Sequence, residues 1–265
     1  MMKVGFLQFK PELLDTGRNI DTITNFLKDI DFDLMVLPEL ANSGYLFTAK
    51  DQLYEVAEEI PYGRFCQMLK TISSEKNAYI VSGICEKYQD RFYNSSVLVY
   101  PDGKVVTYRK IHLFRDEKKW FTPGDIQPEV HSLDNGVKVG MMICFDWIFP
   151  ELCRTLALKG AQIICHPSNL VLGYCQKAVY ARAVENRLFI ITANRTGREE
   201  NQGSSIEFTG NSVIVNPSGD YLASASADQQ ECTVVNIDPS QASDKYVTPE
   251  NNIFEDRRPE FYYKH

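Results

Sequence analysis

Cys144 has the sequence surroundings of a possible nucleophile. It ends an apolar run that begins at Gly140, and a turn and a helix are expected directly after it. A nucleophile at such an elbow projects from the end of its strand, and free backbone N–H groups after it can bind an oxyanion. The dipole of a following helix also favours a thiolate. Taken alone, however, a cysteine in an apolar run is more often a small buried hydrophobic residue.

Two charged residues also follow apolar runs, far from Cys144 in the sequence. Glu39 comes directly after Leu37 and Pro38, where partial desolvation would make its carboxylate a better general base. Lys110 lies in the partly apolar run 108–114 and could donate to a developing oxyanion. Each of the two, taken alone, is more typical of an exposed loop or a basic surface cluster.

Three segments that include these residues are more specific together than each is alone. Residues 37–45, 108–124 and 140–151 together resemble the nitrilase superfamily of carbon–nitrogen hydrolases. The resemblance covers nearly the whole chain, and nothing departs from it at the catalytic triad of that family. The sequence from Cys144 to Glu151 and the chain length look most like the small stand-alone microbial members.

The resemblance implies that Glu39, Lys110 and Cys144 form a catalytic triad. Glu117 matches the additional active-site glutamate of many members, and is expected to orient Lys110 or the substrate. In the implied mechanism Glu39 takes the proton of Cys144, and the thiolate attacks an amide, carbamoyl or nitrile carbon. Lys110 and the backbone N–H of Phe145 stabilise the oxyanion, and water activated by Glu39 hydrolyses the resulting thioester.

The implied activity is that of a hydrolase acting on non-peptide carbon–nitrogen bonds. The preferred reaction converts a small aliphatic amide or N-carbamoyl compound to an acid and ammonia. A true nitrilase acting on small aliphatic nitriles shares the triad, so this alternative stays open, and acyl transfer is a third, less favoured activity. A catalytically silent binding protein on the same fold is the alternative of another class. It would predict a broken triad, whereas all three residues are present.

Aromatic side chains near these motifs predict a compact substrate pocket. The expected substrate-binding residues are Tyr45, Phe145, Trp147 and His166. His166 is favoured as a structural residue over a catalytic base. Arg195 and Arg198 could bind a substrate carboxylate, although surface solvation is the preferred interpretation of both, and the polar segment 199–204 beside them predicts a mobile loop.

Strand-like and helix-like segments alternate along the chain, which is typical of an α/β fold. The predicted strands are residues 2–9, 33–37, 79–85, 95–100, 105–108, 137–143, 162–165, 188–193, 211–215, 221–225 and 233–237. The predicted helices are an apolar stripe over 20–30 capped by Asp15 or Thr16, a second stripe over 65–72, and residues 150–159 and 175–187.

The two halves of the chain show a faint internal repeat. Similar segments recur in the same order, in the pairs 3–5 and 138–140, 37–38 and 166–167, and 96–101 and 212–217. Two similar sheet-plus-helix layers packed sheet to sheet would explain this, and the resemblance implies the same four-layer αββα sandwich. Because no linker separates the halves, residues 1–265 are expected to form one domain. The tail 240–265 resembles a dimer contact, which implies a homodimer or a higher even oligomer.

Composition excludes several classes of protein. The 265 residues are 44% hydrophobic and carry 28 Lys and Arg against 35 Asp and Glu, a net charge of −7. The chain is therefore too apolar to be disordered and too acidic for a dedicated nucleic-acid binder. It has no apolar run of about 18 residues, so no membrane span is expected.

The cysteines indicate the cellular compartment of the protein, and the histidines indicate whether it binds a metal. The seven cysteines are odd in number and irregularly spaced, and no export signal is seen, so a reduced, cytoplasmic protein is expected. None of the four histidines pairs at metal-ligand spacing, and neither a P-loop nor a dinucleotide-binding glycine motif is present. We therefore expect no metal and no nucleotide cofactor, with a small molecule as the substrate.

Overall fold

Two six-stranded mixed sheets form the centre of the protein, for which a computed structural model describes residues 1–262. The first sheet has the order β14 (Glu231–Ile237), β1 (Met2–Gln8), β2 (Leu34–Val36), β3 (Tyr79–Tyr88), β4 (Arg91–Val99) and β5 (Val105–Arg109). The second has the order β13 (Tyr221–Ser224), β12 (Val213–Val215), β9 (Phe189–Ala193), β8 (Ile163–Pro167), β7 (Lys138–Met141) and β6 (Val130–Ser132). Every residue of the inner strands β2, β8 and β9 is buried, as parallel strands covered on both faces require.

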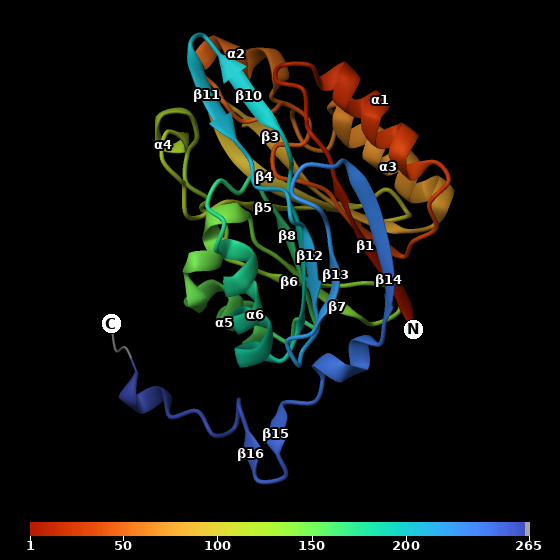
Figure 1. Cartoon of the computed structure of the whole chain (residues 1–265), viewed down its shortest axis with the longest axis vertical. Coiled ribbons are helices and arrows are strands. Elements are labelled where there is room, and N and C mark those ends of the chain that lie inside the picture. Colours follow the sequence, from red (N-terminus) through yellow and green to blue (C-terminus); the bar gives the residue numbers. More distant parts are fainter. Residues whose placement is uncertain (263–265) are drawn as a thin grey trace.

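Helices cover the outer face of each sheet (Figure 1). They are α1 (Thr16–Leu27) and α3 (Arg64–Lys76) on the first sheet, and α5 (Pro150–Leu158) and α6 (Cys175–Asn186) on the second. Asp15 caps α1, because its side chain accepts a hydrogen bond from the Arg18 N–H at 2.9 Å. Ile23 and Leu27 of α1 then pack with Phe65 of α3 in one buried cluster against the sheet.

Several smaller elements connect or extend these layers. In the described residues they are the helices α2 (Lys50–Val56) and α4 (Glu117–Trp120), the 3₁₀ turns η1 (Cys144–Ile148), η2 (Pro239–Ala242) and η3 (Pro259–Phe261), and the hairpins β10 (Arg198–Asn201) with β11 (Ser204–Glu207) and β15 (Tyr246–Thr248) with β16 (Asn251–Asn252).

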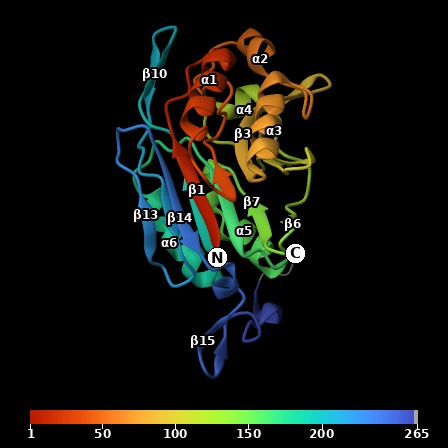
Figure 2. The ribbon, with the colours of Figure 1, turned by 90° about the vertical axis from the view of Figure 1, so that its right-hand side faces the viewer.

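The inner faces of the two sheets pack against each other. β1, β2 and β3 contact β8 and β9, and Val4 and Val36 share a buried cluster with Ile164 and Ile190. The layers therefore run helix, sheet, sheet, helix, as Figure 1 shows, and Figure 2 looks onto the face that α1 and α3 cover. This arrangement confirms the expected four-layer αββα sandwich.

The two sheets repeat one topology. The order β14-β1-β2-β3-β4-β5 in the first sheet matches β6-β7-β8-β9-β12-β13 in the second. Each run has an antiparallel edge strand, three parallel strands and a closing pair of antiparallel strands. Helices α1 and α5 follow the first parallel strand of each run, and α3 and α6 follow the second. The expected internal repeat is therefore present in the strand order, with β14 supplied by the C-terminal part of the chain.

One expectation from the sequence is wrong in this region. Residues 199–204 are predicted as a mobile loop, but they belong to the hairpin of β10 and β11. A turn at Gln202 and Gly203, both with positive φ, joins the strands. The composition of the segment is polar because the hairpin projects from the sandwich (Figure 1), so it shows no apolar alternation that would predict strands.

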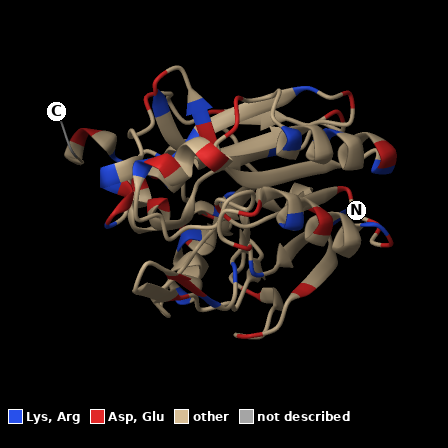
Figure 3. Ribbon diagram, turned by 90° about the horizontal axis from the view of Figure 1, so that it is seen from above, with Lys and Arg blue, Asp and Glu red and all other residues tan. Residues whose placement is uncertain are grey.

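The surface carries charges of both signs. Acidic and basic residues are interspersed over the ribbon (Figure 3). Among residues 1–262, no helix is both long and apolar enough to pass through a membrane.

Gly83 of β3 lies directly against the segment that carries Glu39. A Cβ at this position would lie 2.3 Å from the Glu39 Cα, 2.6 Å from the Leu40 nitrogen and 2.7 Å from the Pro38 oxygen. We expect Gly83→Ala to lower the free energy of unfolding by about 1–3 kcal/mol, because the backbone of this segment must move to relieve the contact. Urea unfolding measures this change. Gly173→Ala is the control, since its Cβ would meet nothing within 4 Å, and equal stability of the two variants would contradict the prediction.

Candidate active site

A buried ion pair joins the first two predicted site residues. Glu39 follows the inner strand β2, and Lys110 directly follows β5 of the same sheet. The Lys110 Nζ lies 2.7 Å from the Glu39 Oε1, and neither side chain is exposed. Asn94 of β4 holds the same oxygen, because its Nδ2 donates to it at 2.6 Å. The Glu39 Oε2 has no hydrogen-bond partner among the described residues.

Glu117 places a second carboxylate on Lys110. Its Oε1 accepts from the Lys110 Nζ at 2.9 Å and from the Tyr45 hydroxyl at 2.8 Å, and its Oε2 accepts from the Phe114 N–H at 3.2 Å. Burial alone would lower the pKa of Lys110, but the charges of Glu117 and Glu39 raise it above its ordinary value. The ammonium is therefore charged, and two of its three N–H groups bind carboxylates.

Cys144 lies beside these charges at a sharp turn. It is the first residue of η1, just past β7, and its φ of 41° is in the left-handed region that non-glycine residues seldom adopt. Burial raises the pKa of its thiol well above the ordinary value, and Glu39 and Glu117 raise it further, whereas Lys110 lowers it. The backbone N–H of Asn169 also lowers the pKa of the thiol. The structure thus brings together Glu39, Lys110, Glu117 and Cys144, which the sequence singled out.

Asp146 connects the Cys144 turn to the segment after Lys110. Its buried carboxylate accepts from the Tyr108 hydroxyl at 2.8 Å, from the Ile143 N–H at 2.9 Å and from the His112 N–H at 3.2 Å. The His112 ring nitrogen Nδ1 lies 2.8 Å from the same carboxylate. The sequence does not predict this role of Asp146, which stands out only as an acidic residue between two aromatic residues in an apolar segment.

His166 supports Cys144 from the other side. It belongs to β8 and is fully buried, with Nδ1 3.0 Å from the Thr192 Oγ1 and Nε2 2.9 Å from the Cys144 carbonyl oxygen. Burial lowers the pKa of His166 to about 4, so the neutral ring donates through Nε2 to that carbonyl. The structure therefore places His166 behind the Cys144 backbone, not in a cavity. Both ring nitrogens therefore have protein partners, and a substrate-binding role of His166 stays a prediction.

A small cavity, here called the thiol cavity, lies next to Cys144 and measures about 20 Å³. Its lining residues are Phe114, Cys144, Phe145, Trp147, Asn169, Leu170, Val171 and Leu172. Phe145 and Trp147 therefore lie where the sequence predicted aromatic pocket residues.

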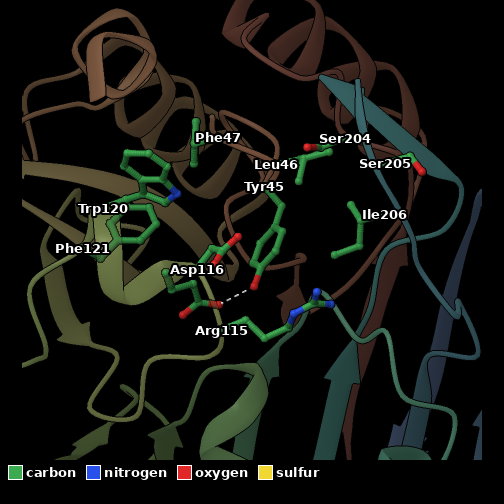
Figure 4. Close-up of a pocket in the computed structure, with 11 residues that line it drawn as sticks. Tyr45, Leu46, Phe47, Arg115, Asp116, Trp120, Phe121, Ser204, Ser205 and Ile206 are labelled. Carbon is green, nitrogen blue, oxygen red and sulfur yellow. Dashed lines mark hydrogen bonds between the residues drawn. The ribbon is translucent and has the colours of Figure 1, made fainter. Parts of the chain in front are cut away.

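A larger cavity, here called the outer cavity, measures about 280 Å³ and lies on the Glu117 side of the site. Its lining residues are Tyr45, Leu46, Phe47, Arg115, Asp116, Glu117, Trp120, Phe121, Ser204, Ser205 and Ile206. Figure 4 shows the Arg115 side chain running below the Tyr45 ring, and its dashed line marks the hydrogen bond from the Tyr45 hydroxyl to Glu117. Arg115 is a cavity residue that sequence analysis did not consider.

The two candidate carboxylate-binding arginines have other places. Arg195 is fully buried, which overturns its expected surface position, and it forms an ion pair with Glu199 while its guanidinium lies 4.0 Å from the Phe208 ring centre. Glu199 in turn accepts from the Tyr45 N–H at 3.0 Å. Arg198 is exposed, and its Nε forms an ion pair with the Glu200 Oε1 at 3.0 Å. Neither arginine lines the thiol cavity or the outer cavity.

Among residues 1–262, no group of three or more His, Cys, Asp or Glu side chains is placed to hold a metal ion.

Comparison with known proteins decides the family. The family model described as carbon-nitrogen hydrolase matches residues 3–245. The chain belongs to the carbon-nitrogen hydrolase family. As a member of this family, the protein is a hydrolase that acts on carbon–nitrogen bonds.

Similar members of the family include both nitrilases and amidases. A protein named nitrilase from Pyrococcus abyssi is 41% identical over 100% of both chains. An (R)-stereoselective amidase from Pseudomonas sp. is 36% identical over 97% of this chain and 92% of its own. A variant of the amidase from Nesterenkonia sp. AN1, solved with acrylamide added to its active-site cysteine, has a TM-score of 0.79 at 25% identity and covers 98% of each chain.

The raised pKa of Glu117 predicts a pH-dependent stability for this carbon-nitrogen hydrolase. Burial raises the pKa of Glu117 to about 7, with Glu39 adding to the rise and Lys110 opposing it. Between the ordinary value near 4.5 and about 7, the folded protein keeps a proton that the unfolded chain releases, so stability falls as the pH rises through this range.

We therefore expect Glu117→Gln to gain stability relative to the wild type as the pH rises from about 5 to about 8, because glutamine cannot ionise. Urea unfolding at several pH values gives the difference between the two proteins. Glu75→Gln at an exposed position is the control, and its difference should stay constant. A pH-independent difference for Glu117→Gln would contradict the prediction.

Proposed function

We propose that the protein hydrolyses a small aliphatic amide or N-carbamoyl compound to an acid and ammonia, through a thioester on Cys144. The observation that carries this proposal is the buried Lys110 ammonium, held 2.7 Å from Glu39 and 2.9 Å from Glu117 beside the thiol. A fixed cation next to a nucleophile and a carboxylate provides the three groups that acyl transfer to a thiol needs.

Glu39 is the proposed base for the first step. The raised pKa of Cys144 keeps the thiol protonated in the free enzyme, so attack on the substrate requires a proton acceptor. The Oε2 of Glu39 has no protein partner, whereas its Oε1 is held by Lys110 and Asn94. Glu39 can therefore take the thiol proton through one oxygen without losing the contacts that position it.

Lys110 and η1 provide the proposed oxyanion site. Two Lys110 N–H groups bind Glu39 and Glu117, which leaves the third for the substrate oxygen. The N–H of Phe145 lies in the first turn of η1, where helical N–H groups lack a partner within the helix. Glu117 contributes by fixing the ammonium, and the Tyr45 hydroxyl fixes Glu117.

The second half of the reaction uses the same groups. The tetrahedral intermediate expels its nitrogen as ammonia with the proton held by Glu39, which leaves an acyl group on the Cys144 sulfur. Water then gives one proton to Glu39 and attacks the thioester, and that proton returns to the sulfur as the acid leaves. One amide and one water are consumed, and one acid and one ammonia are formed.

Nitrile hydrolysis is the second candidate, and the relative named nitrilase at 41% identity favours it. The same thiol would attack the nitrile carbon, and two waters would be consumed instead of one. Ammonia release from a matched panel of nitriles, ω-amides and N-carbamoyl compounds distinguishes the two activities. The silent binding protein of the sequence analysis would release ammonia from none of them.

Cys144→Ala should abolish turnover of the best substrate in this panel, by at least about 10⁴-fold, because the nucleophile is lost. Intact mass spectrometry of acid-quenched wild-type enzyme should show an acyl adduct that peptide mapping assigns to Cys144. Cys232→Ala, at a half-buried position outside the site, is the control and should keep both activity and adduct. Retained turnover in Cys144→Ala, or an adduct on another cysteine, would disprove the mechanism.

We further infer that residues 1–265 form one carbon–nitrogen hydrolase domain that pairs through its C-terminal tail, residues 240–265. The tail extends away from the sandwich (Figures 1 and 2), and its last residues, 263–265, lie outside the described part. Val247 and Phe261 in this tail are 54% and 71% exposed, which is unfavourable unless a second chain covers them.

We also propose a reducing, cytoplasmic location, because all seven cysteines of the chain are free thiols.

The tail proposal predicts a particle of twice the 30.3 kDa chain mass, or a higher even multiple, in light scattering coupled to size-exclusion chromatography. Replacing both Val247 and Phe261 by Glu should shift the particle toward the mass of one chain, because two charges cannot be buried in an apolar contact. Tyr62→Glu, at a residue that is 78% exposed on another surface, should leave the mass unchanged. A monomeric wild type would refute the proposal.

A further inference from the structure

Asn169 has an unusual side chain for its position. It follows β8, it is only 3% exposed, and it lines the thiol cavity together with Cys144. Neither its Oδ1 nor its Nδ2 has a hydrogen-bond partner among the described residues. A buried polar group without a partner costs about 1–3 kcal/mol, so such groups are rare and call for an explanation.

Other asparagines near the site do not share this property. Asn94 donates to Glu39 through its Nδ2, so only its Oδ1 is unpartnered. Asn194, just after the neighbouring strand β9, accepts from the Leu170 N–H at 2.8 Å and donates to the Gly210 oxygen at 2.6 Å. Asn194 is therefore a structural residue, whereas the carboxamide of Asn169 makes no hydrogen bond to the described residues.

The backbone fixes Asn169 next to the reacting sulfur. Its backbone N–H lowers the pKa of the Cys144 thiol, and its side chain lines the thiol cavity together with that residue. The other walls of the cavity are mainly apolar, with Phe145, Trp147 and Leu170 among them. Within the thiol cavity, a group bound at the Cys144 sulfur would thus meet the donor and the acceptor of the Asn169 carboxamide among mainly apolar walls, in addition to the Glu39 and Lys110 groups of the proposed mechanism.

We infer that Asn169 selects substrates that carry an N–H on the reacting group, and so favours amides and carbamoyl compounds over nitriles. This inference rests on the proposed function. An amide nitrogen donates to the Asn169 Oδ1, and it keeps its hydrogens in the tetrahedral intermediate. A nitrile has no hydrogen to donate and develops negative charge on its nitrogen during attack, so either orientation of the carboxamide leaves Oδ1 unpaired. Sites built to bond an N–H discriminate strongly against analogues without it.

Asn169→Leu tests the inference, because leucine has nearly the same shape and neither polar atom, and the backbone keeps its N–H. The substrates are propionamide, propionitrile and methyl propionate, which share one acyl group and differ in the N–H. We expect kcat/KM for propionamide to fall about 10–100-fold, as the loss of one buried hydrogen bond predicts, with little change for the nitrile and the ester. The preference for the amide should fall by the same factor. An equal loss on all three substrates, or no loss on the amide, would overturn the inference.

Stability separates a selecting role from a structural one. Because the Asn169 carboxamide is unpaired in the free protein, Asn169→Leu should unfold at the same temperature as the wild type or higher. Asn194→Leu is the matched control, and it should lower the unfolding temperature and reduce activity on all substrates alike. A lower unfolding temperature for Asn169→Leu would contradict the inference.

Failure of the proposed function has a different signature. In that case the wild type would form no acyl adduct on Cys144 with any of the three substrates, whatever the behaviour of Asn169→Leu. If the adduct forms and the substrate preference does not change, only the role of Asn169 is refuted.

Discussion

The buried Lys110 ammonium between two carboxylates is the interaction on which the site depends. Removing an ion from water costs several kcal/mol, and an ion pair offsets this cost only when its geometry and remaining hydrogen bonds are good. Here the second contacts are supplied by Asn94 on Glu39 and by Tyr45 and Phe114 on Glu117. The Tyr45 backbone N–H donates to Glu199 of β10, so the β10–β11 hairpin supports the site indirectly, through Tyr45. The loop, hairpin and strand ends therefore have to assemble together for the cation to be buried.

The nucleophile depends on the same assembly, because its backbone is held from both sheets. Asp146 binds Tyr108 of β5 in the first sheet, and His166 of β8 in the second sheet binds the Cys144 carbonyl. These two contacts hold Cys144 at a φ that would otherwise be unfavourable. A strained turn fixed from two directions keeps the sulfur close to Glu39 and Lys110, which follow strands of the first sheet. The active site is therefore a product of sheet-on-sheet packing and cannot form within either half alone.

The sequence predicts the parts of this arrangement that follow from position along the chain. Glu39, Lys110 and Cys144 each come directly after or close to an apolar strand, and strands that pack in one sandwich bring such ends together. It does not predict partners that come from distant segments. Arg195 was expected on the surface because an isolated arginine usually is, but Glu199 and the Phe208 ring offset its charge in the interior.

The sequence does not predict the role of Asn169 either. This role rests on a side chain without hydrogen-bond partners, and no sequence pattern encodes an unpaired carboxamide. The internal repeat explains why it lies where it can act. Glu39 directly follows Pro38 after β2, and Asn169 follows Pro167 by two residues at the end of β8, the matching strand of the other sheet. Packing the repeats face to face directs these two strand ends at one place. One half therefore supplies the carboxylate, and the other supplies a carboxamide at nearly the equivalent position. An internally repeated fold can in this way give one pocket a base and a recognition group of different chemistry.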